Sequence, residues 1–110
     1  KMIGITRTKN IVMRSLRINA TKAVEWGIAT DKFPDADLEK ATDALVDELR
    51  TFSPLAQRTA KKLLNDTEEA SLSMAIELEG HCYSRLRTSD DFREGVLAFG
   101  EKRAPKFKGT

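Results

Sequence analysis

Helix start and stop signals recur at short intervals along this chain and restrict it to a set of short helices. Between residues 38 and 52 the apolar residues fall at steps of three and four, as on one face of an α-helix, and Asp35 or Asp37 is placed to cap this helix. Ser53 and Pro54 then begin the next one, because serine is a favoured N-cap and proline fits the first helical position. The pattern predicts a mostly α-helical fold.

The same signals predict the other elements. We expect helices over residues 6–16, 20–26, 38–52, 55–64, 67–86 and 90–103. Asn19 is expected to cap the helix over residues 20–26, and Gly27 to end it. The helix over residues 90–103 is expected to be capped by Ser89, or by Thr88 with Asp91. A break is expected at residues 65–67. Residues 28–33 are expected to be extended, because Pro34 disfavours helical geometry in the residue before it. The expected fold is therefore five to six helices and one short extended segment, with no domain boundary inside the chain.

Charge is distributed unevenly along the sequence. Residues 1–22 carry +6 with no acidic residue and residues 102–110 carry +4, so the net charge of +2 leaves −8 on residues 23–101. Two interpretations stay open. The basic ends bind an anionic partner such as a phosphate-bearing ligand, or they neutralise the acidic middle of this chain or of a partner chain. Aromatic residues make up 6% of the chain and offer little surface for stacking bases, so we expect no nucleic-acid partner.

The sequence also bears on the compartment. No apolar run approaches the roughly 18 residues that a membrane span requires, and the first residues lack the apolar stretch of a signal peptide. A single cysteine excludes an internal disulfide and is compatible with a reducing compartment. We therefore expect a cytoplasmic protein with no membrane partner.

No group of residues forms a catalytic or metal-binding pattern. His81 and Cys82 are adjacent, so on a helix they point about 100° apart and cannot serve as base and nucleophile. Glu77 lies one helical turn before His81, but no second histidine exists to complete a metal site, so a surface pair is expected. We predict no catalytic residue, no metal ligand and no covalently bound cofactor in these 110 residues.

One constellation near the end of the chain suits a ligand. Phe99, Lys102 and Arg103 stand at helical spacings of three and four, so that a ring and two cations share a side. Such a group fits a ligand that carries both a flat base and phosphates. Alternatively, Phe99 lies in the core with Phe92, and the cations are favoured by the helix dipole at the C-terminal end. The residues alone leave both interpretations open.

Residues 89–109 closely resemble the end of members of the enoyl-CoA hydratase/isomerase (crotonase) family. The recurring residues are Asp90, Glu94-Gly95, Ala98-Phe99, Glu101-Lys102-Arg103, Pro105 and Phe107, and upstream Arg17 to Ala20, Ala23, Gly27-Ile28 and Lys61 to Leu64 fit the same register. Two positions depart from the family. Arg14-Ser15 stands where Thr-Gly is usual, which bears on the local turn, and Gly100 replaces a larger apolar residue inside the last helix.

The resemblance implies that the chain is a single C-terminal helical segment of an enzyme acting on an acyl-CoA thioester, whose ββα spiral core and catalytic residues precede it. The implied partners are acyl-CoA and further copies of the chain, in a trimer or a dimer of trimers. Phe99 and Lys102 match family positions that reach coenzyme A bound mainly by the neighbouring subunit. Without the resemblance, the alternative is a non-catalytic helical module that self-associates through its apolar faces.

Overall fold

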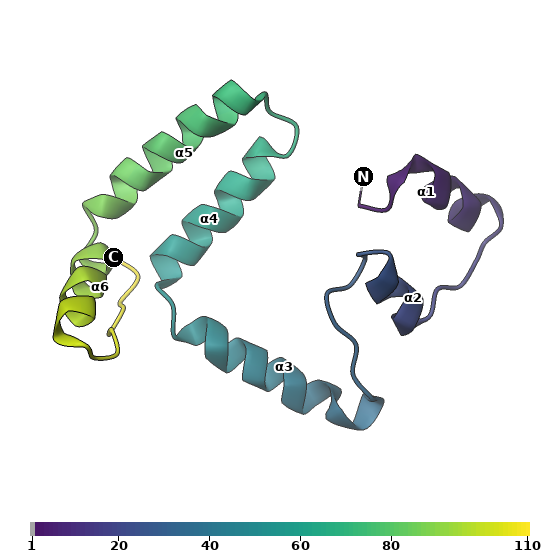
Figure 1. Ribbon diagram of the computed structural model, residues 1–110, viewed down its shortest axis with the longest axis horizontal. Coiled ribbons are helices and arrows are strands. Elements are labelled where there is room, and N and C mark those ends of the chain that lie inside the picture. Colours follow the sequence, from purple (N-terminus) through teal and green to yellow (C-terminus); the bar gives the residue numbers. More distant parts are fainter. Residues whose placement is uncertain (1) are drawn as a thin grey trace. The chain divides into compact units, whose positions relative to one another are not determined.

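Six α-helices make up the protein in a computed structural model that describes residues 2–110 (Figure 1). The helices are α1 (Gly4–Met13), α2 (Ala20–Glu25), α3 (Asp35–Arg50), α4 (Pro54–Thr67), α5 (Leu72–Arg87) and α6 (Asp90–Glu101). The predicted mostly α-helical fold is confirmed. Residues 28–33, expected to be extended, lie outside the helices, and no β-strand occurs within residues 2–110.

The asparagine and serine caps predicted for three helices are present. Asn19 Oδ1 accepts the N–H of Lys22 at 2.9 Å, Ser53 Oγ accepts that of Ala56 at 3.1 Å, and Ser89 Oγ accepts that of Phe92 at 3.1 Å. Each bond satisfies a backbone donor that has no partner inside its own helix. These local contacts fix where α2, α4 and α6 begin.

The connection between α4 and α5 lies later than predicted. α4 continues to Thr67, whose hydroxyl donates to the carbonyl oxygen of Leu63 at 2.8 Å, so residues 65–67 do not break it. α5 begins at Leu72, because Ser71 Oγ accepts the N–H of Met74 and caps the helix there. The prediction that one helix runs from Thr67 was therefore wrong.

Two other helix ends differ from the prediction. Asp35 and Asp37 lie inside the first turn of α3 rather than before it, where the helix dipole favours their negative charge. α6 ends at Glu101 rather than at Arg103, because Lys102 adopts a left-handed conformation. The shorter α6 changes which side chains share a face at its end.

The structure divides into two compact units between Ala44 and Leu45, within α3. The first unit contains α1, α2 and the beginning of α3. Here the Arg7 guanidinium and the Lys22 ammonium lie 5.3 and 5.1 Å from the ring centroid of Trp26. The Arg7 contact joins α1 to the end of α2, and the Lys22 contact is local to α2.

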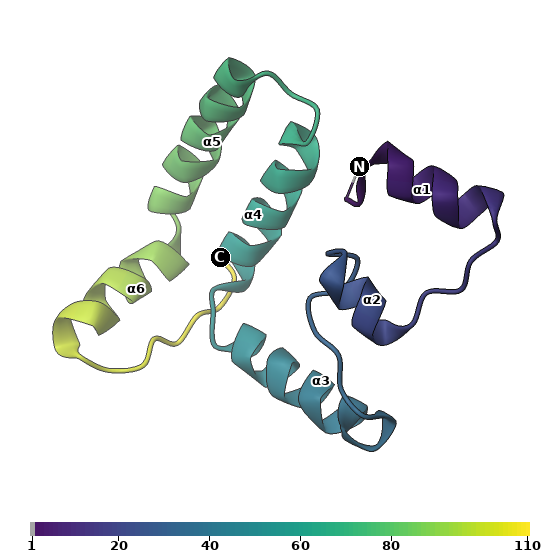
Figure 2. The same cartoon turned by 45° about the vertical axis from the view of Figure 1, so that its right-hand side comes forward.

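The second unit is built on α4 and α5, which pack side by side as an antiparallel hairpin, with α6 against α5 (Figures 1 and 2). The chain after α6, residues 104–110, runs back to the start of α4, where Arg58 Nη2 donates to the carbonyl oxygen of Gly109 at 3.1 Å. Among residues 2–110, Ala98 is the only buried apolar side chain, and Ser53 and Asp91 are buried polar ones. A polar contact therefore occupies the centre of this unit.

No helix within residues 2–110 is both long enough and apolar enough to span a membrane.

Candidate functional site

The end of α6 is a Schellman turn with a lysine in the position that glycine usually takes. Lys102 has φ 53° and ψ 40°, in the left-handed region. Its N–H donates to the carbonyl oxygen of Phe99 at 3.3 Å, and the N–H of Arg103 donates to that of Ala98 at 3.1 Å. These two bonds define the motif. A non-glycine residue in this conformation is uncommon, so the position merits a physical explanation.

The two residues predicted to bind a ligand are both accessible. The side chain of Phe99 is 89% exposed, whereas Phe92 is half-buried, so Phe99 is not part of a core in this unit. Lys102 is exposed, and within residues 2–110 its ammonium pairs with no carboxylate. Arg103 does not join them, because α6 ends before it and the helical spacing no longer applies.

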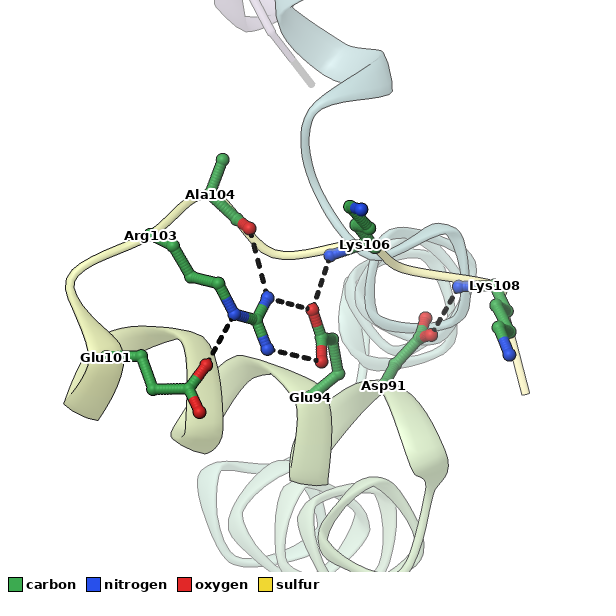
Figure 3. A network of polar contacts seen from close by, with 7 residues as sticks. All are labelled: Asp91, Glu94, Glu101, Arg103, Ala104, Lys106 and Lys108. Carbon is green, nitrogen blue, oxygen red and sulfur yellow. Dashed lines mark hydrogen bonds and ion pairs between the residues drawn. The ribbon is translucent and has the colours of Figure 1, made fainter.

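Arg103 instead binds back onto α6 (Figure 3). Its Nη1 and Nη2 donate to Glu94 Oε1 and Oε2 at 2.6 and 3.1 Å, and its Nε donates to Glu101 Oε2 at 2.6 Å. Nη1 also donates to the carbonyl oxygen of Ala104 at 3.2 Å, and the N–H of Lys106 donates to Glu94 Oε1 at 2.7 Å. We call the bidentate pair of Arg103 and Glu94 the clamp.

The clamp is charged throughout the neutral pH range. Hydrogen bonds from the Arg103 guanidinium, together with the N–H of Lys106, lower the pKa of Glu94 to about 2. The hydrogen bonds that Arg103 donates to Glu94 and Glu101 raise the pKa of Arg103 further above its ordinary value. The Glu94 and Arg103 side chains are 22% and 36% exposed, so water screens their attraction, and the clamp contributes geometry more than stability. Arg103 is thus one cation of the basic C-terminal residues that pairs with two acidic residues of the middle segment.

Asp91 holds the last residues of the chain. This side chain is only 4% exposed, and its carboxylate accepts the Ser53 hydroxyl at 2.5 Å, the N–H of Lys108 at 2.7 Å and the N–H of Gly109 at 3.0 Å. Its own N–H donates to the carbonyl oxygen of Thr110 at 3.0 Å. Burial acts to raise the pKa of Asp91, but these hydrogen bonds outweigh it and hold the pKa below its ordinary value. One carboxylate thus joins α4, α6 and the tail.

The sequence did not indicate these roles of Asp91 and Glu94. The sequence offers Asp91 as the partner of Thr88 in a capping box, but Ser89 alone caps α6 and the Thr88 hydroxyl donates to the carbonyl oxygen of Arg85. The signal in the sequence is two acids three residues apart on one helix, followed by a basic tail. That pattern does not specify which donor each acid binds.

A groove of about 450 Å³ lies beside Phe99, between α5, α6 and the tail. Its apolar lining includes Tyr83, Leu86, Phe92, Val96, Phe99 and Phe107, together with Ala56 of α4. Phe107 packs on α6 beside Gly95: a Cβ placed on Gly95 would lie 3.7 Å from Phe107 Cε1, an ordinary van der Waals distance. An exposed ring that lines an apolar groove thus lies three residues before an unpaired cation. This arrangement suits a ligand with a flat group and negative charge.

The pair predicted on α5 is present and exposed. Glu77 Oε1 lies 3.9 Å from His81 Nε2, and both side chains are largely in solvent. Within residues 2–110, no three His, Cys, Asp or Glu side chains lie close enough to hold a metal ion.

Comparison with known proteins gives one consistent result. The sequence profile of the enoyl-CoA hydratase/isomerase family matches residues 1–110. The chain is 35% identical over 109 residues to a trans-2-decenoyl-[acyl-carrier-protein] isomerase of Streptococcus mutans, covering 99% of this chain and 41% of that protein. It is 33% identical over 110 residues to a 2,3-dehydroadipyl-CoA hydratase of Escherichia coli, covering 99% of this chain and 43% of that protein.

The fold agrees with solved structures. The crystal structure of an enoyl-CoA hydratase from Bacillus anthracis superposes with a TM-score of 0.94 at 29% identity, over 99% of this chain and 42% of that one. An enoyl-CoA hydratase from Geobacillus kaustophilus gives a TM-score of 0.93 at 30% identity, with 99% and 41% covered. The chain thus spans about two-fifths of the length of the curated relatives it matches.

Proposed function

The chain belongs to the enoyl-CoA hydratase/isomerase family, and on that premise we propose that it forms the C-terminal helical part of an enzyme that acts on an acyl-CoA thioester. The observation that carries this proposal is the family match over residues 1–110, together with the accessible ring and cation at the end of α6. The catalytic residues of such an enzyme would lie outside these 110 residues. Family membership favours this proposal over a non-catalytic self-associating module.

Phe99 and Lys102 are the proposed ligand contacts. Coenzyme A ends in an adenine ring and phosphates, so it presents both a flat surface and negative charge. Phe99 offers an exposed ring for the base, and Lys102 offers a point charge for a phosphate. In the family such contacts are made to a coenzyme A bound mainly by a neighbouring subunit, and we propose the same arrangement here.

The names of the relatives leave the acyl carrier open. The Escherichia coli hydratase is named for a CoA thioester, and the Streptococcus mutans isomerase for one on acyl carrier protein. An acyl carrier protein holds the acyl group on a phosphopantetheine arm that lacks the adenine nucleotide. We propose coenzyme A for this protein, because Phe99 and Lys102 together suit the nucleotide.

We also propose that α3 and α5 supply contacts between copies of the chain, in a trimer or a dimer of trimers. Both helices expose apolar side chains that a soluble monomer would ordinarily cover. The residues are Leu38, Leu45, Leu49 and Phe52 on and just after α3, and Leu72, Ile76 and Tyr83 on α5, each between 46% and 77% exposed.

The test is coenzyme A binding to the full-length protein with Lys102→Ala, measured by calorimetry. Loss of a charge-assisted contact should weaken binding by about tenfold at low salt and by less at high salt. A pantetheine thioester, which lacks the nucleotide, should bind both proteins equally.

Lys9→Ala removes an equal charge from the exposed face of α1 and serves as the control. It should leave coenzyme A binding unchanged. Equal coenzyme A affinity of the wild type and Lys102→Ala would remove the proposed contact. Equal weakening by both lysine variants would reduce it to a general effect of net charge.

A further inference from the structure

Lys102 occupies an uncommon conformation that its surroundings must maintain. Within residues 2–110, only Ser15 and Lys102 are non-glycine residues with positive φ. A side chain in the left-handed region is strained by the contact of its Cβ with the backbone. Such strain persists where neighbouring contacts over-determine the geometry, and it concentrates at functional positions. Contacts of its neighbours must therefore hold Lys102.

The residues on either side of Lys102 are bound to one another. Arg103 Nε donates to Glu101 Oε2 at 2.6 Å, which closes a bridge across the turn. The clamp then attaches Arg103 to Glu94, two turns back on α6, through two parallel N–H···O bonds. Bidentate bonds of this kind fix direction as well as distance. Lys102 thus sits between two anchored neighbours.

The tail supports the clamp from the other side. The N–H of Lys106 donates to the same Glu94 oxygen that Arg103 Nη1 binds. Phe107 packs beside Gly95, one residue further along α6. Glu94 therefore receives donors from both the turn and the tail, as Figure 3 shows, and its loss would remove one contact of the tail and the bidentate contact of the turn.

The two adjacent cations have different environments. Every nitrogen of the Arg103 guanidinium already donates to an acceptor within the chain, namely Glu94, Glu101 or Ala104. Lys102 keeps its ammonium unpaired within residues 2–110. The donors of Arg103 are thus occupied by contacts within the chain, whereas the ammonium of Lys102 remains available to a ligand.

We infer that Glu94 is a positioning residue that acts through Arg103 to hold Lys102 in its left-handed turn, ready for a phosphate of coenzyme A. This inference rests on the proposed function above. A fixed backbone reduces the freedom that a long lysine side chain loses on binding, and such preorganisation improves affinity without adding a contact. Glu94 itself does not touch the ligand.

The test is a double-mutant cycle on the full-length protein, with free coenzyme A as the probe and calorimetry as the readout. Lys102→Ala should weaken binding about tenfold and Glu94→Gln about threefold. In the Lys102→Ala background, Glu94→Gln should have no further effect, because its influence passes through Lys102. A merely structural role would not produce this dependence.

Arg93→Gln is the matched control. It breaks the exposed ion pair of Arg93 with Asp90 on the same helix, at 2.8 Å, without touching the turn. Coenzyme A affinity should not change in this variant. Should Glu94→Gln lower the melting temperature too far for calorimetry, Arg103→Lys replaces it. Lysine keeps the cation but lacks the bidentate fork, so the same threefold loss is expected.

The outcomes separate the two proposals. An additional threefold loss when Glu94→Gln is added to Lys102→Ala would show that Glu94 acts independently, which overturns this inference and leaves the proposed function intact. Unchanged affinity in both Glu94→Gln and Arg103→Lys would also overturn it. Unchanged affinity in Lys102→Ala would remove the proposed ligand contact, and this inference with it.

Discussion

The ends of α1 and α6 share one backbone geometry in different surroundings. Ser15 follows α1 with φ 49°, close to the 53° of Lys102 after α6. The N–H of Ser15 donates to the carbonyl oxygen of Val12 at 3.2 Å, and that of Leu16 to the carbonyl oxygen of Ile11 at 3.0 Å. Both ends are therefore Schellman turns with a non-glycine residue at the left-handed position.

Side chains distinguish the two turns. Next to Ser15, Arg14 Nη1 donates to Asn10 Oδ1 at 3.1 Å, a local contact within the helix it ends. Around Lys102, by contrast, the clamp and the tail tie the turn to α6 and through Asp91 to α4. A left-handed residue alone is thus no sign of function. The network that fixes it is the informative feature.

The turn at the end of α1 contains two residues, Arg14 and Ser15, at which the sequence departs from the family. Arg14-Ser15 replaces the usual Thr-Gly, and the structure keeps a left-handed residue there in spite of the serine side chain. α2 makes the turn with the expected residue: Gly27 has φ 72°, and its N–H donates to the carbonyl oxygen of Val24 at 3.0 Å. At the end of α1 the two backbone bonds accompany this geometry without a glycine, whose presence would lower its strain. At Lys102 the clamp is added to the same two backbone bonds.

Asp91→Ala should remove most of the difference between the ends of α1 and α6, and it should have the largest effect on stability. It leaves Ser53 Oγ and the N–H groups of Lys108 and Gly109 without their acceptor in a largely buried place. We expect residues 104–110 to exchange amide hydrogens as fast as residues 14–18, and the melting temperature of the full-length protein to fall by roughly 5 °C or more. Hydrogen–deuterium exchange and calorimetry measure the two effects.

Asp90→Ala is the control for that substitution. It removes the same charge from the same first turn of α6, but Asp90 is exposed and pairs with Arg93. Tail exchange should stay slow in this variant. Equal loss of protection in both variants would mean that charge at the start of α6, and not the contacts of Asp91, holds the tail.

Acid should loosen the end of α6 and leave that of α1 unchanged. Because the pKa of Glu94 is lowered from 4.5 to about 2 on folding, its contribution to stability is complete above pH 4.5 and is lost as the pH falls through about 2. The N–H of Lys106, which donates to Glu94, should report this loss by NMR with a midpoint near pH 2. The N–H of Leu16 donates to a backbone carbonyl and should not titrate.

Glu94→Gln abolishes the titrating group and should leave the Lys106 resonance constant over the same range. A midpoint near 4.5 in the wild type would show that Glu94 is unpaired in solution. The end of α6 would then lack the clamp, as the end of α1 does, and the two turns would not differ in this respect.

The sequence predicts contacts between residues a few positions apart, such as helix caps. It does not predict hydrogen bonds between residues far apart in the sequence. The caps at Asn19, Ser53 and Ser89 each involve a backbone N–H three residues ahead, so the residue type alone indicates them. Asp91 binds a hydroxyl 38 residues away and two amides of the returning tail. No periodicity encodes that return. The resemblance to the family identifies Glu94 and Arg103 as recurring residues, but it does not show that they bind each other.

The smallest effects come from relieving the strain at the two turns themselves. Ser15→Gly and Lys102→Gly should each raise the free energy of unfolding by up to about 1 kcal/mol, because glycine adopts the left-handed region without a Cβ clash. Gly27→Ala should do the opposite by about 1 kcal/mol, since a Cβ there meets nothing within 4 Å and only the conformation is penalised. Chemical denaturation of the full-length protein measures the stability of all three variants.

Of these variants, only Lys102→Gly should also weaken coenzyme A binding. If Lys102→Gly lowers the free energy of unfolding instead, the lysine side chain stabilises the fold. The conclusion that Lys102 serves only the ligand would then be wrong.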